Sequence, residues 1–397
     1  MRILGISYGT EGDTRPMAAL SRGLLDAGHT VLLMGDASGL VSAEALGVPT
    51  VALAGDLQDL MRNTPADATG PQIVKLVNKH TSAWMAAALA ECPADLILAG
   101  GLSVYVAESV GERTNTPVIQ TILTPVGSRT RDFVSPILAG LPLPRWGWLN
   151  LLTHSIVCWF AWFVFVSATN AARKEHSLPP NRRRRLGDPQ VYGISPALLP
   201  RPIDYPANAL FTGQWVPPAK AWDPQPELEA FLAAGDKPIY VGFGSMAGVS
   251  TSLLAQLRAA IGDRRAIFGR GWSTVTDLPP NFFVVDNVPH DWLLPRCAMA
   301  IHHGGSGTTH SACAAGVPSI ILPTVADQYF WARVMVDIGV ADHVLRMHRL
   351  DVVKLRAAIA FADTRAPQER ARAIGEAMGR EDGVSAAVAA IEAFAER

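Results

Sequence analysis

The feature that most constrains the fold is a repeated alternation of short, continuously apolar runs with amphipathic stretches. Residues 3–6 form the first such run, a glycine-containing loop follows up to Pro16, and apolar residues then recur three and four positions apart between Met17 and Leu25. Runs that do not alternate in polarity are typical of strands buried on both faces, and the longer spacing is typical of helices. The alternation therefore predicts β-α-β units and an α/β fold with parallel sheets.

The alternation occurs in two blocks, which a proline-rich stretch separates. Eight prolines fall between Pro196 and Pro226, a density that disfavours a regular helix or a central strand. New apolar runs follow, the first from Pro238 to Phe243 and the last from Ser319 to Leu322. We therefore expect two doubly wound, Rossmann-like domains that face a central cleft. Their expected limits are residues 1–205 for an N-terminal domain, 206–226 for the linker, 227–380 for a C-terminal domain, and 381–397 for a final helix.

Charge and cysteine content exclude several classes of protein. The 34 basic and 35 acidic residues give a formal net charge of -1, so no global basic field attracts nucleic acid. The four cysteines are far apart and form no CxxC pair, which argues against a disulfide framework and a zinc site. The chain begins with a strand-like run and not with a secretory signal, so we expect a cytoplasmic protein. These patterns do not predict an oligomeric state.

The most informative loop spans residues 302–309 and reads HHGGSGTT. It lies between a predicted strand and a predicted helix, at the edge where parallel sheets bind ligands. Its glycines allow a ligand to approach the backbone, and the free amides at the start of the helix favour an anion. We interpret the loop as a phosphate site in which His303 donates a hydrogen bond. The alternative is a glycine-rich turn with a structural histidine.

Two further loops end strands of the same block. Residues 241–246 could supply a second phosphate contact through Ser245. A nicotinamide dinucleotide site is disfavoured there, because the next predicted strand ends at Arg270 without an acidic residue for a ribose. Asp327 and Gln328 end another strand and suit the vicinal hydroxyl groups of a sugar. They could equally well cap the following helix.

The block from Val288 to Ala341 resembles the donor-binding signature of the family-one nucleotide-sugar glycosyltransferases, which have the GT-B fold. The resemblance rests on VPHDWL at 288–293, HHGGSGTT at 302–309, AGVP at 315–318 and DQYFW at 327–331. The sequences YGISPALLPRP at 192–202 and GQW at 213–215 resemble the branch of sterol glucosyltransferases and bacterial natural-product glycosyltransferases. The resemblance covers nearly the whole chain and is weak between residues 40 and 185.

This resemblance implies that residues 1–205 form an acceptor-binding domain, that residues 227–380 form a donor-binding domain, and that the final helix packs back on the first domain. It also implies roles for individual residues. The backbone of Val288 would pair with the base, Trp272 would pack near it, and Asp327 and Gln328 would hold the sugar. The implied contacts with the diphosphate are those of Ser245, His303, Gly305, Gly307 and Thr308. Gly12 of the N-terminal half would also contact the donor. No Asp-x-Asp pair occurs in the sequence, which fits a donor bound without a metal ion, and we expect no cofactor.

The N-terminal loop from Gly9 to Pro16 reads GTEGDTRP and is similar to the GSxGDxxP loop of the sterol branch. Asp13 therefore matches the residue expected to act as the base toward an acceptor hydroxyl. An ordinary aspartate is a weak base for an alcohol, so this role requires a desolvated carboxylate. The alternative is that Asp13 only caps the helix that begins at Pro16. Glu11 stands where arginine is frequent in that branch.

An aromatic, apolar segment from Trp146 to Ala168 lies where GT-B acceptor domains carry pocket-lining helices. We expect Trp159, Phe160 and Phe163 to line a pocket for a lipophilic, hydroxylated acceptor. The alternative is peripheral contact with the inner face of a membrane, since basic residues follow at 182–185. A membrane span is disfavoured, because only residues 156–166 are continuously apolar and a span needs about 20 residues.

Together these features predict an inverting, metal-independent glycosyltransferase. It would move a hexose from a UDP- or dTDP-sugar to a hydroxyl of a sterol, polyketide, glycolipid or other lipophilic small molecule. Asp13 would remove the proton, and His303 would stabilise the leaving diphosphate. Two alternatives stay open: a non-catalytic protein that binds nucleotide sugars or lipids, and a GT-B nucleotide-sugar epimerase.

Overall fold

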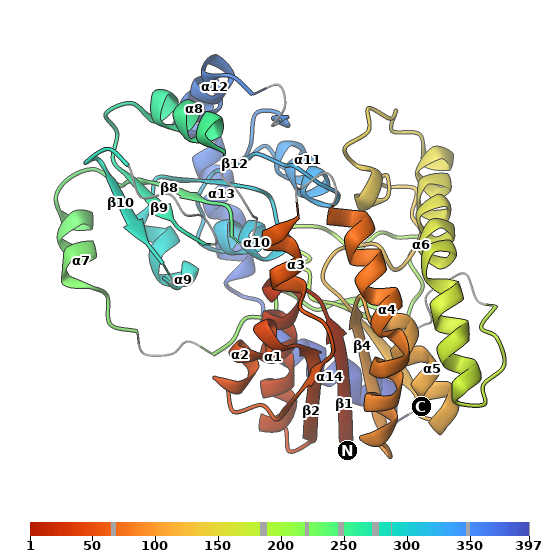
Figure 1. Ribbon diagram of the computed structural model, residues 1–397. Helices are drawn as coiled ribbons and strands as arrows, with labels where there is room; N and C mark the ends of the chain where they lie inside the picture. The colour runs from red at the N-terminus through yellow and green to blue at the C-terminus, as the bar shows by residue number, and fades with distance from the viewer. Residues whose placement is uncertain are drawn as a thin grey trace.

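The computed structural model describes residues 1–64, 69–182, 189–218, 222–244, 250–271, 278–286, 288–346 and 350–396. Its strands form two parallel sheets, each flanked by helices, as the alternation in the sequence predicted (Figure 1). One sheet has seven strands in the order β3-β2-β1-β4-β5-β6-β7, and the other has five in the order β10-β9-β8-β11-β12. The chain is therefore an α/β protein with two doubly wound sheets.

The seven-stranded sheet comes from the N-terminal half of the chain. Its strands are β1 (Arg2–Tyr8), β2 (Thr30–Asp36), β3 (Thr50–Leu53), β4 (Leu96–Gly101), β5 (Val118–Ile122), β6 (Gln190–Tyr192) and β7 (Ala209–Phe211). The accompanying helices are α1 (Glu11–Asp26), α2 (Ala37–Glu44), α3 (Leu57–Asn63), α4 (Thr69–Ala90), α5 (Val104–Thr114), the short η1 (Pro136–Leu138) and α6 (Gly147–Glu175). β1 lies between β2 and β4 and is buried from Ile3 to Tyr8, which explains its continuous apolar run.

Residues 209–211, which we expected in the linker, form β7 at the edge of this sheet. An edge strand is compatible with the surrounding proline density, because Pro206 and Pro217 lie outside the strand and remove none of its hydrogen bonds. The crossing between the two sheets therefore starts later than the sequence pattern suggested.

The five-stranded sheet comes from the C-terminal half. Its strands are β8 (Ile239–Gly242), β9 (Ala266–Gly269), β10 (Phe282–Val285), β11 (Met299–His302) and β12 (Ser319–Ile321). The helices are α7 (Pro226–Ala233), α8 (Thr251–Ile261), α9 (His290–Leu293), η2 (Leu294–Arg296), α10 (Ser306–Ala314), α11 (Gln328–Asp337), α12 (Val352–Ala362) and α13 (Arg365–Met378). His302 pairs with Gly242, so the loops after β8 and β11 leave the sheet side by side.

The last helix, α14 (Gly383–Ala395), returns to the N-terminal half and packs on α1 (Figure 1). Ala387, Val388 and Ile391 belong to the same buried cluster as residues of α1 and β1. An added Cβ at Gly23 would lie 2.3 Å from Val384 Cγ1, so the glycine allows the two helices to approach closely.

The two halves also share an apolar core. Ile122 and Tyr192 of the first sheet lie in one buried cluster with Ile321 and Trp331 of the second half. The rings of Phe133 and Phe330 are 4.9 Å apart between centroids. The loops that follow β5 and β12 therefore meet where the two halves are in contact.

Candidate active site

Asp13 lies in the first turn of α1, directly after β1. The helix begins at Glu11 and not near Pro16, because Thr10 and Asp13 form a capping box. Asp13 Oδ2 accepts hydrogen bonds from the Thr10 backbone amide at 2.9 Å and from the Thr10 hydroxyl at 3.1 Å. The prediction of a loop up to Pro16 is therefore wrong, and Asp13 does stabilise the start of its helix.

Gly9 leaves space for the Asp13 carboxylate, because glycine has no side chain. An added Cβ at Gly9 would lie only 2.5 Å from Asp13 Oδ2. The other carboxylate oxygen, Oδ1, takes no hydrogen bond from the described part of the chain. Burial raises the pKa of Asp13 above its usual value, while the two bonds from Thr10 lower it. A carboxylate with a raised pKa and one unengaged oxygen is suited to accept a proton.

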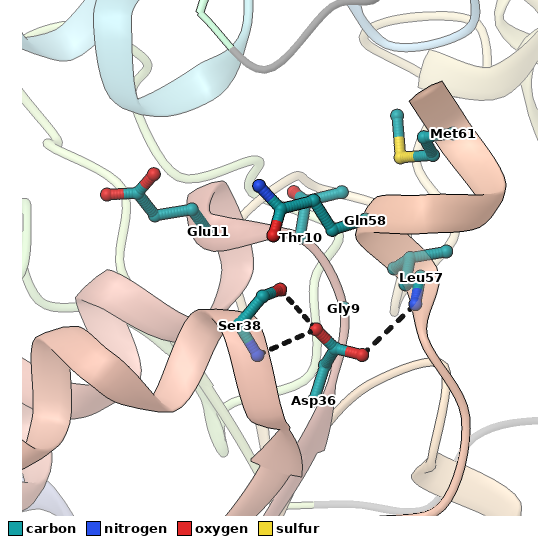
Figure 2. Close-up of a pocket in the computed structure, with 8 residues that line it drawn as sticks. All are labelled: Gly9, Thr10, Glu11, Asp36, Ser38, Leu57, Gln58 and Met61. Carbon is teal, nitrogen blue, oxygen red and sulfur yellow. Dashed lines mark hydrogen bonds between the residues drawn. The ribbon is translucent and has the colours of Figure 1, made fainter. Parts of the chain in front are cut away.

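A pocket opens beside this turn, and the sequence analysis did not identify it (Figure 2). It is lined by Gly9, Thr10, Glu11, Asp36, Ser38, Leu57, Gln58 and Met61. Asp36 accepts hydrogen bonds from the backbone amides of Ser38 at 3.2 Å and Leu57 at 3.1 Å, and from the Ser38 hydroxyl. The available signal was an acidic residue just after the predicted strand at 30–34. Thr10 contacts Asp13 and also lines this pocket, so the pocket adjoins the candidate base.

Asp327 and Gln328 lie after β12, where the chain enters α11. The buried Gln328 accepts hydrogen bonds at Oε1 from the amide and the hydroxyl of Thr324, both at 2.9 Å, and from the Val325 amide at 3.3 Å. Ala326 has a φ of 44°, a left-handed conformation that side chains with a Cβ rarely adopt. We expected Gln328 to hold the sugar. In the structure its side-chain carbonyl oxygen stabilises the strained loop that positions Asp327.

Asp327 also contacts the other half of the molecule. The hydroxyl of Thr124, which follows β5, donates a hydrogen bond to Asp327 Oδ2 at 3.1 Å. Burial raises the pKa of Asp327 to about 6, the bond from Thr124 lowers it, and the charge of Asp13 raises it. Asp13 and Asp327, predicted from opposite halves of the sequence, therefore lie close enough to repel each other.

The glycine-rich loop leads into the first turn of α10, with Gly305 as the N-cap. The first amides of this helix, those of Ser306, Gly307 and Thr308, have no carbonyl of their own helix as a partner. An added Cβ at Gly307 would meet no atom within 4 Å, so this turn faces open space. The Ser306 hydroxyl donates to the Leu123 carbonyl at 2.8 Å. Leu123 precedes Thr124, so the anion-binding end of α10 adjoins the contact with Asp327.

His303 packs between glycines after β11. A Cβ added to Gly305 would lie 2.6 Å from His303 Nε2, and a Cβ added to Gly244 would lie 3.2 Å from His303 Cε1. Burial lowers the pKa of His303 to about 4, the backbone of Gly242 raises it, and His290 lowers it. The imidazole is therefore neutral at pH 7. Its buried Nδ1 has no hydrogen-bond partner among the described residues, which leaves it able to bind a ligand atom.

His290, at the start of α9, is hydrogen-bonded within the C-terminal half. Its Nε2 lies 3.1 Å from the hydroxyl of the buried Tyr240. Burial lowers the pKa of His290 to about 4, and the nearby charge of Arg15 on α1 lowers it further. Val288, the predicted base-binding residue, lies partly buried in the loop before α9, and Gly12 is exposed in the first turn of α1.

Some predicted residues are outside the described part of the chain, and others are on the surface. Ser245 and Trp272 fall outside the described residues. Trp159, Phe160 and Phe163, which we expected in an acceptor pocket, are 50%, 58% and 62% exposed on the outer face of α6. They point outward because α6 packs on the domain through its opposite face, where Trp162 and Phe165 contact the ring of Tyr105.

Within the described ranges no three His, Cys, Asp or Glu side chains form a possible metal site.

Several known proteins are similar to this chain in sequence or in fold. Residues 266–390 match the family described as "Erythromycin biosynthesis protein CIII-like, C-terminal domain". The chain is 33% identical over 433 residues to O-mycaminosyltylonolide 6-deoxyallosyltransferase of Streptomyces fradiae, which covers 100% of this chain and 98% of that protein. It is 28% identical to a sterol 3-beta-glucosyltransferase of Arabidopsis thaliana, over 98% of this chain and 67% of that protein. The solved structure of glycosyltransferase VinC in complex with dTDP superposes with a TM-score of 0.69 at 19% identity, and covers 100% of both chains.

Proposed function

We propose that this chain, which belongs to the GT-B glycosyltransferases of the sterol and natural-product branch, moves a hexose from a nucleoside diphosphate sugar. The acceptor is a hydroxyl group of a lipophilic small molecule, such as a sterol or a polyketide. The sugar is transferred in one displacement, with inversion at the anomeric carbon. The named activities of the Streptomyces and Arabidopsis relatives support this acceptor class, and the dTDP held by VinC supports the donor class.

On the acceptor side, Asp13 removes the proton as the hydroxyl oxygen attacks the sugar. Thr10 fixes Oδ2, so Oδ1 is the oxygen that accepts the proton. Burial makes the carboxylate a stronger base than an exposed aspartate. A positioned base of this kind contributes about 10² to 10⁴ in rate.

On the donor side, the amides at the start of α10 bind the diphosphate, and His303 donates a hydrogen bond to it. Burial lowers the pKa of His303 to about 4 and so keeps the imidazole neutral at pH 7. A bound diphosphate favours the charged imidazole and therefore raises this pKa. Asp327 orients the sugar hydroxyls. These groups stabilise the leaving charge in the way that a divalent cation does in other transferases, so we propose a metal-independent reaction.

One observation carries the proposal: Asp327 of the C-terminal half accepts a hydrogen bond from Thr124 of the N-terminal half at 3.1 Å, and the charge of Asp13 raises the pKa of Asp327. A direct displacement needs a base and a bound sugar on the two sides of one reacting carbon. Thr124 and Ser306 bridge the halves at the same place. Neither half alone holds both parts of the site.

The test is to incubate the purified chain with radiolabelled UDP- and dTDP-hexoses and with sterol, macrolide and glycolipid acceptors. Label in an acceptor supports the proposal, and a β-linked product from an α-linked donor, read from the anomeric proton coupling by NMR, supports inversion. An altered nucleotide sugar or free sugar without an acceptor product indicates an epimerase. Donor binding without any product across the panel indicates a binding protein.

A further inference from the structure

The fully buried residues of helix α6 are mostly polar, whereas its most exposed side chains are large and apolar. Its buried positions are Asn150, Thr153, His154, Thr169, Ala172 and Arg173, and all but one of these are polar or charged. Its largest exposed side chains are Trp148, Leu152, Ile156, Trp159, Phe160 and Phe163, which we call the apolar stripe. A helix on the surface of a water-soluble domain has the opposite arrangement. An exposed apolar band of this kind is typical of an interaction site.

Specific hydrogen bonds fix this orientation of the helix. Asn150 Nδ2 donates to the carbonyl of Arg131 at 2.7 Å, and His154 Nε2 lies 3.2 Å from the carbonyl of Phe133. At the other end, the buried Arg173 guanidinium binds both carboxylate oxygens of Glu112 at 3.0 Å. Rotation of the helix to bury the stripe would leave these polar groups unpaired, at a cost of about 1–3 kcal/mol for each.

The stripe is large enough to act as an interaction surface. Its residues are spaced three or four apart from Trp148 to Phe163, which on a helix makes a band about 22 Å long. Trp148 and Phe163 are each 62% exposed, and Trp159 and Phe163 stack with their centroids 5.5 Å apart. Half-exposed aromatic side chains of about 150–250 Å² each leave several hundred Å² of apolar surface in this band, as much as the largest patch of a typical monomer.

Basic residues flank the stripe at both ends. Residues 129–145 include three basic residues and one acidic residue. Residues 173–185 include six basic residues and one acidic residue. Arg129 and Arg145 at one end, and Lys174 and Arg182 at the other, are exposed, although Arg145 also pairs with Asp337 at 2.9 Å. No Asp, Glu, Lys or Arg lies between Gly147 and Ala172.

This charge pattern separates two possible occupants. If two copies of the chain met through the stripe, in parallel or antiparallel, the basic end of one copy would meet a basic end of the other, which is unfavourable. An anionic bilayer attracts both ends and accepts the aromatic side chains at its interface. The helix is long and apolar enough to cross a membrane by length and composition. Its buried polar face, however, is bonded to the domain, which favours a helix that lies on the surface.

We propose that the apolar stripe of α6 docks the protein on the surface of an anionic lipid bilayer. The helix lies in the plane of the interface, its aromatic side chains enter the headgroup region, and the basic ends bind anionic headgroups. This inference does not depend on the reaction that the active site performs, because it concerns a surface outside the residues proposed for catalysis.

The test is co-flotation of the full chain with vesicles, in the absence of any sugar donor. Vesicles of phosphatidylcholine alone are compared with vesicles that contain 30% phosphatidylglycerol, a standard anionic composition. We expect binding to the anionic vesicles that is at least ten-fold stronger than to the neutral ones. The double variant Trp148→Gln and Ile156→Gln should reduce the partition coefficient at least ten-fold.

The matched control is the double variant Ile203→Gln and Val353→Gln, which replaces two apolar side chains that are 93% and 76% exposed away from the stripe. It should bind vesicles like the wild type, and circular dichroism should show that both variants keep their helical content. Equal binding to neutral and anionic vesicles, or no vesicle binding at all, overturns the proposal. The proposal is also overturned if light scattering shows that the wild type and the control variant are dimers and the stripe variant is not. A second copy of the chain would then cover the stripe.

Discussion

Replacement of Asp327 by asparagine is expected to make the protein more stable at pH 8 and inactive at the same time. The pKa of Asp327 is raised from 3.8 to about 6, chiefly by burial. The folded state therefore binds this proton more tightly than the unfolded chain does. The stability of the wild type falls as the pH rises from about 4 through about 6, because the buried group must ionise. Asparagine keeps the shape, and its carbonyl oxygen can still accept the bond from Thr124.

The size of the effect follows from the pKa shift. A shift of about two units corresponds to about 3 kcal/mol, and the partial exposure of the side chain reduces this to about 2 kcal/mol. For a domain of this size, about 2 kcal/mol corresponds to a rise in Tm of about 4–8 °C. Transfer should fall by about two orders of magnitude or more, because the sugar loses a charged hydrogen-bond acceptor.

The assay is thermal unfolding of the wild type and of Asp327→Asn at pH 8 and at pH 4.5, beside transfer activity at pH 8. Asp263→Asn, which removes an exposed carboxylate, serves as the control and should leave Tm unchanged at both pH values. The reasoning is refuted if Asp327→Asn is less stable than the wild type at pH 8, or if the gain in Tm is as large at pH 4.5 as at pH 8.

Two further substitutions test how the site is positioned. Gly9→Ala places a methyl group where the Asp13 carboxylate now lies, so kcat should fall at least ten-fold while the Kd for the nucleotide stays unchanged. Initial rates give kcat and isothermal titration calorimetry gives the Kd. Equal losses of catalytic rate and of nucleotide affinity would point to general unfolding. Thr124→Val removes the bond to Asp327 and is expected to raise the pKa of that carboxyl, so the acidic limb of the pH–rate profile should move to higher pH; an unmoved limb would show that the bond does not affect the active carboxyl.

The sequence predicted the scaffold well, because buried parallel strands leave a strong pattern. The runs at 118–122 and 298–302 became β5 and β11, with bounds within one residue. The start of α1 was placed too late, because Pro16 gave a stronger signal than the Thr10 and Asp13 capping box. β7 was missed because it has only three residues and lies among prolines.

The candidate site could be predicted only in part. The residues of the glycine-rich loop and both carboxylates carry recognisable motifs, but the bond from Thr124 to Asp327 joins residues 203 positions apart, and no local pattern encodes it. The orientation of α6 could not be predicted either. A helix that is apolar on nearly all sides has no periodicity to show which face packs inward. Its orientation depends on specific contacts such as the hydrogen bonds of Asn150 and Arg173.

The central claim is that a carboxylate of the N-terminal half activates the acceptor while the C-terminal half holds the donor. The most direct measurement compares Asp13→Asn with Glu11→Gln, which changes the exposed carboxylate two residues away. Nucleotide binding by calorimetry and sugar transfer are measured on the same preparations. We predict that Asp13→Asn binds UDP or dTDP like the wild type and transfers at least 100-fold more slowly, while Glu11→Gln retains both properties. Transfer by Asp13→Asn at a rate near that of the wild type would contradict the claim.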